Sequence, residues 1–478
     1  MNLNEFQEGP HKYRPVWVIT VLGLLLRSYH YLRNPALWHD EAATLLNILR
    51  KGFAELLGPL YASGTGPPLF LWLQKSAVLC FGDSTYALRI VSLLASCAAL
   101  LLMAILVPRL LKPVPAATCI LVVACSDRLL WHAAEARHYS TDVLLASGLT
   151  FLFVVSGKWT PRSRALCFAC LAPFGILGSY PGVFLFGGAA IAFLFVLLRH
   201  EQRASTWLAL VGLGVCIALA LLVLFFTTIS AQRTPALDAQ WRQAFPDWHH
   251  PWRVPLWFVR SSVGVVDYIT RPIGGILALV ACIGAVSWWR AETRELVIFL
   301  LAPVALAAAA GLANAYPYTG ARTMVFATPA IALLIGSGIQ RAGSWINGRH
   351  LRGWLAGSGI ALPLLATLLF SIYRMWVPWP RADTSGAAAY VLEHRAEAEP
   401  VTANHLEYEY YFRTLNARFY PDLRLLREED LPARYWIVVT SGDPTFATTV
   451  TNNIRHSRVV ERREFVRTTV LHVINETN

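Results

Sequence analysis

Charged residues are scarce in this chain of 478 residues, at 15% against roughly 25% in soluble domains. Acidic residues are fewer than basic ones, 29 against 41, and only fifteen of the twenty-nine precede residue 379. Apolar runs near the twenty residues needed to cross a bilayer recur instead from Val16 to Tyr373, and the mean hydropathy is +0.46. The low charge excludes an ordinary soluble enzyme, and the lack of short alternating segments excludes a transmembrane barrel. We predict a polytopic α-helical membrane protein.

A separate basic domain is also missing, although the net charge is +12. The basic residues cluster in short loops between apolar runs, which is the orientation signal of a membrane protein. We therefore expect the lipid bilayer as a partner and no nucleic acid. No small-residue cleavage site follows the first apolar run, so the sequence predicts an uncleaved first span.

The basic loops also decide the topology. Lys12 and Arg14 precede the first span and place the N-terminus in the cytoplasm. Leu69–Phe81 is apolar but short, so it is either a span or an interfacial helix. Only the interfacial reading puts every basic loop in the cytoplasm. It leaves eleven spans, at about Val16–Leu32, Leu88–Val107, Ala116–Trp131, Tyr139–Ser156, Ala165–Leu177, Val183–Leu198, Trp207–Ile229, Ile273–Trp289, Leu296–Leu312, Thr323–Ile339 and Trp354–Tyr373.

The composition changes near residue 379, and the remaining fourteen acids follow with no spanning run. We predict a transmembrane domain over residues 1–378, with its first outer loop at about 33–85. A small extracytoplasmic α/β domain is predicted over residues 379–478. Its expected elements are a helix at Thr384–Arg395 and strands at Tyr435–Thr440 and within Val459–Ile474.

The acids before residue 379 fall mostly on one side of the membrane. By this topology ten of the fifteen lie outside or near the outer ends of spans, which indicates a polar cavity there. Adjacent carboxylates, Asp40 and Glu41, directly follow the first span. Within that span, a lone Arg27 at mid-bilayer would cost about 2.5–3.5 kcal/mol, so we expect it to snorkel outward or face an aqueous cavity.

A second polar cluster lies between the third and fourth spans, over residues 132–139. If this segment is extended, Glu135, Arg137 and Tyr139 share one face; if it is helical, Glu135, Tyr139 and Asp142 do. An acid there could bind a divalent metal or orient a base, and an arginine could hold phosphate. The alternative is a loop that is merely solvated.

Three further features have two readings each. Arg322 begins an apolar helix on the outer side and is either an interfacial anchor or a phosphate ligand. Lys75 is either a snorkelling lysine or a phosphate contact. The segment 248–252, Trp-His-His-Pro-Trp, favours an interfacial loop that touches lipid or sugar, and only weakly a metal site.

In this order the segments resemble the GT-C superfamily of membrane glycosyltransferases, and in particular the bacterial branch related to protein O-mannosyltransferases and the lipid A aminoarabinose transferase. The resemblance is strong over residues 27–145 and diffuse beyond. Its motifs are Trp38–Ala42, Gly66–Phe70, Phe81–Ser84, Ala87–Arg89 and Glu135–Ser140. Two positions depart from it: Gly66 stands where many relatives have His, and His138 where they often have Pro.

The resemblance implies a GT-C fold with juxtamembrane helices on the outer face of the cytoplasmic membrane. It also implies a polyprenyl-phosphate-linked sugar donor and a glycan, lipid or protein acceptor. The reaction needs a base for the attacking hydroxyl and positive charge for the departing phosphate.

Residue roles follow from that expectation. Asp40 is the expected base, and Glu41 orients the site or helps to bind a metal. The expected phosphate ligands are Arg137, Arg322 and Lys75. Residues expected to bind the acceptor or orient a metal are Glu135, Tyr139 and His132. The sequence leaves open whether a divalent metal takes part, with Asp40 and Glu135 as its candidate ligands.

Two other functions fit a polytopic chain of this kind. A transporter or flippase of lipid-linked sugars predicts charges through the whole bilayer depth and an internal repeat, and we find no repeat. A non-catalytic protein could also keep the same fold. The clustering of acids on one face favours a glycosyltransferase.

Overall fold

The computed structural model describes residues 9–199, 203–272, 274–291, 293–346, 350–415, 417–420, 422–423, 432–443, 445–454 and 457–476. Its contacts divide the chain into two compact units. The bundle unit comprises Met1–Arg33, Phe53–Pro59 and Thr65–Val377, and the sheet unit comprises Asn34–Gly52, Leu60–Gly64 and Pro378–Asn478. Residues 34–52 and 60–64, which the sequence analysis assigned to the transmembrane domain, therefore pack with the C-terminal residues.

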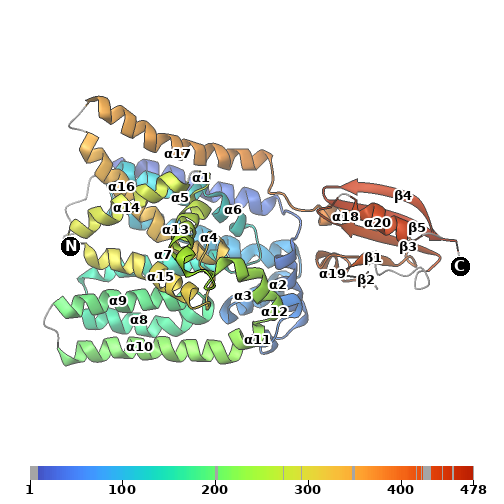
Figure 1. Ribbon diagram of the computed structural model, residues 1–478, viewed down its shortest axis with the longest axis horizontal. Helices are drawn as coiled ribbons and strands as arrows, with labels where there is room; N and C mark the ends of the chain where they lie inside the picture. The colour runs from blue at the N-terminus through green and yellow to red at the C-terminus, as the bar shows by residue number, and fades with distance from the viewer. Residues whose placement is uncertain are drawn as a thin grey trace. The chain divides into compact units, whose positions relative to one another are not determined.

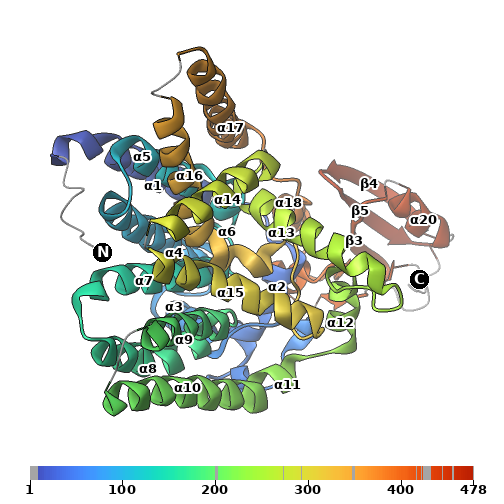
Figure 2. The ribbon, with the colours of Figure 1, turned by 60° about the vertical axis from the view of Figure 1, so that its left-hand side comes forward.

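The bundle unit is built from long apolar helices. Figure 1 shows most of them running side by side along one direction, and Figure 2 shows them after a 60° turn. The longer helices are α1 (Arg14–Leu32), α4 (Thr85–Leu106), α5 (Pro113–Cys125), α7 (Tyr139–Val155), α8 (Pro161–Gly178), α9 (Gly182–Arg199), α10 (Ala204–Leu224), α13 (Val254–Thr270), α14 (Gly274–Arg290), α15 (Arg294–Leu312), α16 (Thr328–Ile346) and α17 (His350–Trp376). The shorter ones are α3 (Pro68–Phe81), α6 (Asp127–Ala133), α11 (Ser230–Gln232) and α12 (Pro235–Trp241).

Several of these helices are long and apolar enough to cross a membrane. Within the described residues six qualify, or up to eight if each of two bent pairs is one span. The multi-pass architecture is therefore confirmed, while the count of eleven stays a prediction. Helix α3 has 14 residues, about 21 Å at 1.5 Å per residue, which is shorter than the roughly 30 Å hydrocarbon core.

The expected third span is broken into two helices. Ser126 adopts an extended backbone between α5 and α6, which meet at 52°. Its hydroxyl caps α6 at the Leu129 amide (3.4 Å) and donates to the Ile269 carbonyl (2.7 Å). The span predicted at about Ala116–Trp131 is therefore a bent pair of helices, because a serine cap starts a new helix inside it.

Arg27 stabilises this break. Its side chain is 1% exposed, so the expectation that it snorkels outward or faces water was wrong. The guanidinium donates to the carbonyls of Val123 (3.0 Å) and Ala124 (3.1 Å), at the end of α5, where a helix leaves its last carbonyls without partners. A further bond, from Nε to the Ser96 hydroxyl (2.8 Å), links α1 to α4.

Residues 231–270, which lie between the spans predicted at about Trp207–Ile229 and Ile273–Trp289, are largely helical. They contain α12 and the 17-residue helix α13, which turns through 104° into α14. Sequence analysis missed α13 because its apolar residues are interrupted by Arg260, Ser261 and Ser262.

The sheet unit contains a five-stranded sheet of order β2-β1-β3-β5-β4. The central strand β3 pairs parallel with β1 and antiparallel with β5. Strand β4 precedes β5 and forms an antiparallel hairpin with it. The elements are α2 (His39–Arg50), α18 (Thr384–His394), β1 (Val401–Ala403), α19 (Glu407–Tyr411), β2 (Arg418–Phe419), β3 (Arg434–Thr440), α20 (Phe446–Asn453), β4 (Ser457–Phe465) and β5 (Thr468–Asn475). The expected helix and strands of this region are thus present.

Alternation along β3 builds a core on each face of this sheet. Tyr435, Ile437 and Val439 pack with α20. Trp436 and Val438 point to the opposite face and pack with α18 and α19. Both faces are covered, which explains why β3 is apolar from Tyr435 to Val439 and does not alternate with polar residues there.

A buried carboxylate ties this core together. Glu399 Oε2 accepts from Trp436 Nε1 (2.8 Å) and from the Ala396 amide (3.2 Å), and Oε1 lies 3.2 Å from His472 Nε2. Burial by itself raises the pKa of Glu399, but the hydrogen bonds from Trp436, Ala396 and His472 outweigh it and hold that pKa below its usual range.

We predict that Glu399→Gln destabilises the sheet unit at neutral pH by about 1–3 kcal/mol, because charged hydrogen bonds are lost. Since the folded pKa is depressed, the stabilisation is present above the ordinary value of 4.5 and disappears as pH falls through the folded value. Amide exchange of β3 and β5 in the full-length protein, at pH 7 and below pH 4, measures both effects. Glu393→Gln, an exposed change on α18, is the control. An equal loss at both pH values would contradict the assignment.

Candidate functional site

The adjacent carboxylates Asp40 and Glu41 lie in the first turn of α2, in the sheet unit. Negative charge is stabilised there by the helix dipole. Glu41 is fully buried, and its Oε2 lies 3.5 Å from Arg381 Nη1. Asp40 is only partly buried. The two carboxylates therefore differ: Glu41 belongs to a buried ion pair, while Asp40 is partly exposed.

The second polar cluster lies in the bundle unit, around His132 at the end of α6. Its Nδ1 is 3.0 Å from Glu135 Oε2, and its Nε2 is 3.0 Å from the hydroxyl of Tyr268 on α13. Glu135 is fully buried, so this contact gives its carboxylate the partner that burial requires. The arrangement fixes the imidazole between a carboxylate and a phenol.

Two arginines approach one aromatic ring beside this histidine. The guanidinium carbon of Arg137 lies 5.6 Å from the centroid of the Tyr139 ring, and that of Arg322 lies 5.9 Å from the same centroid. Arg322 also lies 5.6 Å from the ring of Trp241 on α12. The structure thus brings together two of the three predicted phosphate ligands, which are 185 positions apart in the sequence. A pair of guanidinium groups in a mostly buried setting suits a phosphate.

The turn at Thr65 and Gly66 is held in place by Arg137 and Gln232. Arg137 Nη1 donates to the Thr65 carbonyl (3.3 Å). The next residue, Gly66, donates its amide hydrogen to Gln232 Oε1 (3.1 Å), and its carbonyl accepts from Gln232 Nε2 (3.4 Å). Gln232 Oε1 also accepts from the Tyr180 hydroxyl (2.7 Å).

Gln232 reaches this position through an irregular helix end. A π-helical turn, Phe225–Ile229, separates α10 from the short α11 that ends at Gln232. Such turns change the direction of the residues that follow, and they are frequent at functional sites. The side chain is 2% exposed, so the turn directs Gln232 into the interior of the bundle.

Lys75 and the two histidines of the 248–252 segment have less defined places. Lys75 lies half-buried on α3, and its role as a phosphate ligand stays a prediction. His250 Nδ1 is 2.7 Å from an oxygen of Asp247, in an exposed ion pair. Trp248 donates to the Leu312 carbonyl (3.1 Å), so this segment is anchored to the end of α15.

Metal binding was left open by the sequence. Among the described residues no group of three or more His, Cys, Asp or Glu side chains is placed to hold a metal ion. Whether Asp40 or Glu135 binds a metal stays open, and we derive no step through a metal.

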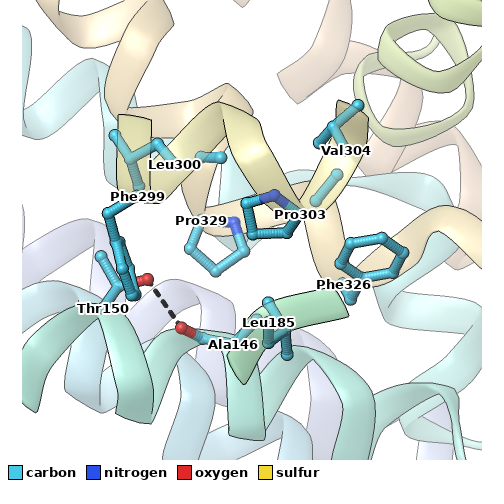
Figure 3. A pocket seen from close by; sticks show the side chains of 11 residues that line it. Ala146, Thr150, Leu185, Phe299, Leu300, Pro303, Val304, Phe326 and Pro329 are labelled. Atoms are coloured by element: carbon cyan, nitrogen blue, oxygen red, sulfur yellow. Dashed lines mark hydrogen bonds between the residues drawn. The ribbon is translucent and has the colours of Figure 1, made fainter. Parts of the chain in front are cut away.

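Two cavities in the bundle unit contain none of the predicted site residues. The first, shown in Figure 3, lies among α7, α9, α15 and α16 and has about 10 Å³ of free volume, enough for about one water molecule. Its lining is apolar apart from Thr150, whose hydroxyl donates to the Ala146 carbonyl (2.7 Å). The second holds about 500 Å³ beside α14 and α16. Its wall includes the exposed Ile283 and Val286.

Sequence analysis missed Tyr268, Gln232, Trp241 and Tyr180. Each comes from a segment at least 40 residues away from the 132–139 cluster, and none stands in a recognisable motif. The π-helical turn before Gln232 gives no sequence signal, because its residues are ordinary apolar and Thr residues. Only the fold brings these side chains to the cluster.

Comparisons with known proteins show the fold. No protein-family model matches the sequence, and a search of characterised proteins finds no sequence match. Among solved structures, ArnT from Cupriavidus metallidurans bound to undecaprenyl phosphate aligns with a TM-score of 0.58 at 14% identity, over 96% of this chain and 97% of that chain. The archaeal oligosaccharyltransferase AglB from Archaeoglobus fulgidus, in complex with an inhibitory peptide and a dolichol-phosphate, aligns with a TM-score of 0.50 at 13% identity, over 94% and 73% of the two chains. Both are GT-C proteins, so the expected GT-C fold is confirmed.

We predict that Gln232→Leu loosens the turn at Gly66, because it removes all three hydrogen bonds of the amide. The loss of buried partners costs about 1–3 kcal/mol. Hydrogen exchange of a peptide covering residues 61–71, in the full-length protein in nanodiscs, should become faster. Ser230→Ala, two residues away and exposed, should leave that exchange unchanged. Unchanged exchange in Gln232→Leu would show that the turn does not depend on this side chain.

Proposed function

We propose that this chain is a glycosyltransferase that moves a sugar from a polyprenyl-phosphate-linked donor to an acceptor hydroxyl. The observation that supports it most directly is the pair Arg137 and Arg322 around the Tyr139 ring, in a chain with the GT-C fold. A departing phosphate needs positive charge that is already in place, and an arginine pair held by the fold provides it without reorganisation.

The structural neighbours support the class of donor. ArnT was solved with undecaprenyl phosphate and AglB with a dolichol-phosphate, and both ligands are polyprenyl phosphates. The likeness covers nearly the whole of this chain. We infer that the phosphate held by this chain is likewise joined to a polyprenyl lipid.

The reaction forms one bond and breaks another. The oxygen of the acceptor hydroxyl attacks the anomeric carbon of the donor sugar. The bond from that carbon to the phosphate oxygen breaks, and its electron pair leaves with the lipid phosphate. A carboxylate takes the hydroxyl proton. In this proposal Arg137 and Arg322 stabilise the phosphate as its negative charge grows.

Asp40 is the proposed base. Its place after the first span and its partial exposure support this role, whereas Glu41 is buried with Arg381 and holds the start of α2. His132, Glu135 and Tyr139 form the wall beside the arginine pair, and we assign them to orienting the acceptor or the donor sugar. Lys75 stays a proposed third phosphate ligand.

The proposed location is the cytoplasmic membrane, with the N-terminus in the cytoplasm and residues 379–478 outside. The distribution of basic loops along the sequence supports this orientation. A flippase for lipid-linked sugars would use the same arginine pair, but it would need no base. The Asp40 variant below separates the two functions.

We predict that Arg137→Met and Arg322→Met each weaken the binding of undecaprenyl phosphate by about 10–100-fold, because charged hydrogen bonds to phosphate are worth about 1.5–3 kcal/mol. The measurement is a titration of the purified full-length protein in detergent. Arg290→Met, an exposed change at the end of α14, removes the same charge and should bind normally. Equal weakening in all three variants would mean that net charge alone attracts the lipid.

We predict that Asp40→Asn lowers transfer by at least about 100-fold while the binding of undecaprenyl phosphate stays normal, because only the base is lost. Mass spectrometry of envelope lipids, glycans and proteins, from cells with the wild-type gene, the variant or no gene, measures the transferred sugar. Asp83→Asn, an exposed change before α4, is the matched control. Normal sugar transfer by Asp40→Asn would overturn the assignment of the base, and a wild-type protein that moves lipid but transfers no sugar would favour the flippase.

A further inference from the structure

Helix α2 packs with the C-terminal domain, although its residues lie in the predicted first outer loop at about 33–85. It forms one compact unit with Pro378–Asn478, more than 320 positions further along the chain. Its sequence is not strongly apolar, and eight of its twelve residues are nevertheless buried. Residues of the C-terminal domain contact the helix at both of its ends.

The first end is held by three side chains of the C-terminal domain. The Leu37 amide donates to the Tyr411 hydroxyl (3.0 Å), and the Leu37 carbonyl accepts from the Thr384 hydroxyl (3.4 Å). Arg381 Nη1 donates to the Ala36 carbonyl (2.9 Å) and lies 3.5 Å from Glu41 Oε2. These contacts fix Ala36 and Leu37, just ahead of the N-cap residue Trp38, and the first turn of α2, which is the turn that carries Asp40.

The other end is held by one carboxylate of α19. Glu409 Oε2 accepts from Arg50 Nη2 (2.7 Å), in the last turn of α2, and Glu409 Oε1 accepts from the Tyr61 hydroxyl (2.6 Å). Tyr61 is in turn tied to α2, because its amide donates to Asn47 Oδ1 (2.7 Å). Glu409 thus joins α2, the segment 60–64 and α19 in a single network.

We propose that the C-terminal domain positions Asp40 for catalysis by clamping α2 at both ends, an inference that rests on the proposed role of Asp40 as the base. Arg381 and Glu41 are almost fully buried, with side chains 6% and 0% exposed, so their pairing is costly to break. A base displaced by about 1 Å loses on the order of 100-fold in rate. The clamp therefore gives the C-terminal domain a direct part in the reaction, as a positioning element.

The test uses full-length Arg381→Met, which removes the charge at the first end, and Glu409→Gln, which weakens the second. We expect three results in each variant: faster hydrogen exchange in α2, sugar transfer reduced by about 10–100-fold, and undecaprenyl phosphate binding within twofold of wild type. Arg381→Lys should recover part of the transfer, because the ammonium group can still reach Glu41 or the Ala36 carbonyl. Arg462→Met, on the exposed edge strand β4, is the control and should change none of the three.

Hydrogen exchange of β3 and β5 distinguishes a positioning role of Arg381 from a general role in the stability of the domain. Positioning predicts that these strands keep their protection in Arg381→Met, whereas unfolding of the domain would expose them and overturn the inference. Normal transfer by Arg381→Met despite faster exchange in α2 would overturn the inference alone. A wild-type protein that neither binds undecaprenyl phosphate nor transfers sugar would overturn the proposed function, and this inference with it.

Discussion

The break between α5 and α6 is the constraint on which the bundle's polar cluster depends. Lipid and packed side chains offer no hydrogen bonds to carbonyls at a helix end, so a break inside the bundle needs a donor from the protein. Arg27 supplies it from α1 by binding the carbonyls of Val123 and Ala124. Because α5 ends there, α6 can leave in a new direction. That direction brings His132 to Tyr268 and starts the segment that carries Arg137. An arginine that looks misplaced in a span is thus required by the fold.

The sequence predicts the elements that depend on the length of apolar runs and on the periodicity of hydrophobic residues. Most spans, the strand at β3 and the strand structure within Val459–Ile474 were expected because apolar runs and alternation report burial directly. The 132–139 cluster was also expected, and its Glu135, Arg137 and Tyr139 do lie together. Gln232 and Tyr268 could not be predicted, because their positions depend on a π-helical turn and on the packing of α13. Neither changes the hydropathy pattern.

The pair Asp40 and Glu41 shows a different limit of prediction from sequence. Neighbouring residues on a helix point about 100° apart, so one can be buried while the other is exposed. The sequence cannot say which is which without knowing what packs on α2. That information lies at Arg381, 340 positions away. The sequence shows two adjacent acids, but only their contacts with the C-terminal domain distinguish the buried carboxylate of Glu41 from the partly exposed one of Asp40.

The arginines of the bundle differ in the groups that orient them. Arg374 and Arg164 pair with carboxylates, at 2.8 Å to Asp127 and 2.5 Å to Glu295. Arg137 and Arg322 both lie against the ring of Tyr139, and Arg322 also lies against the ring of Trp241. An aromatic face orients the planar guanidinium group, and a planar guanidinium group can bind phosphate through two hydrogen bonds at once. The shared ring keeps the two guanidinium groups near each other, and this proximity favours the pair as ligands of one phosphate in the proposed function.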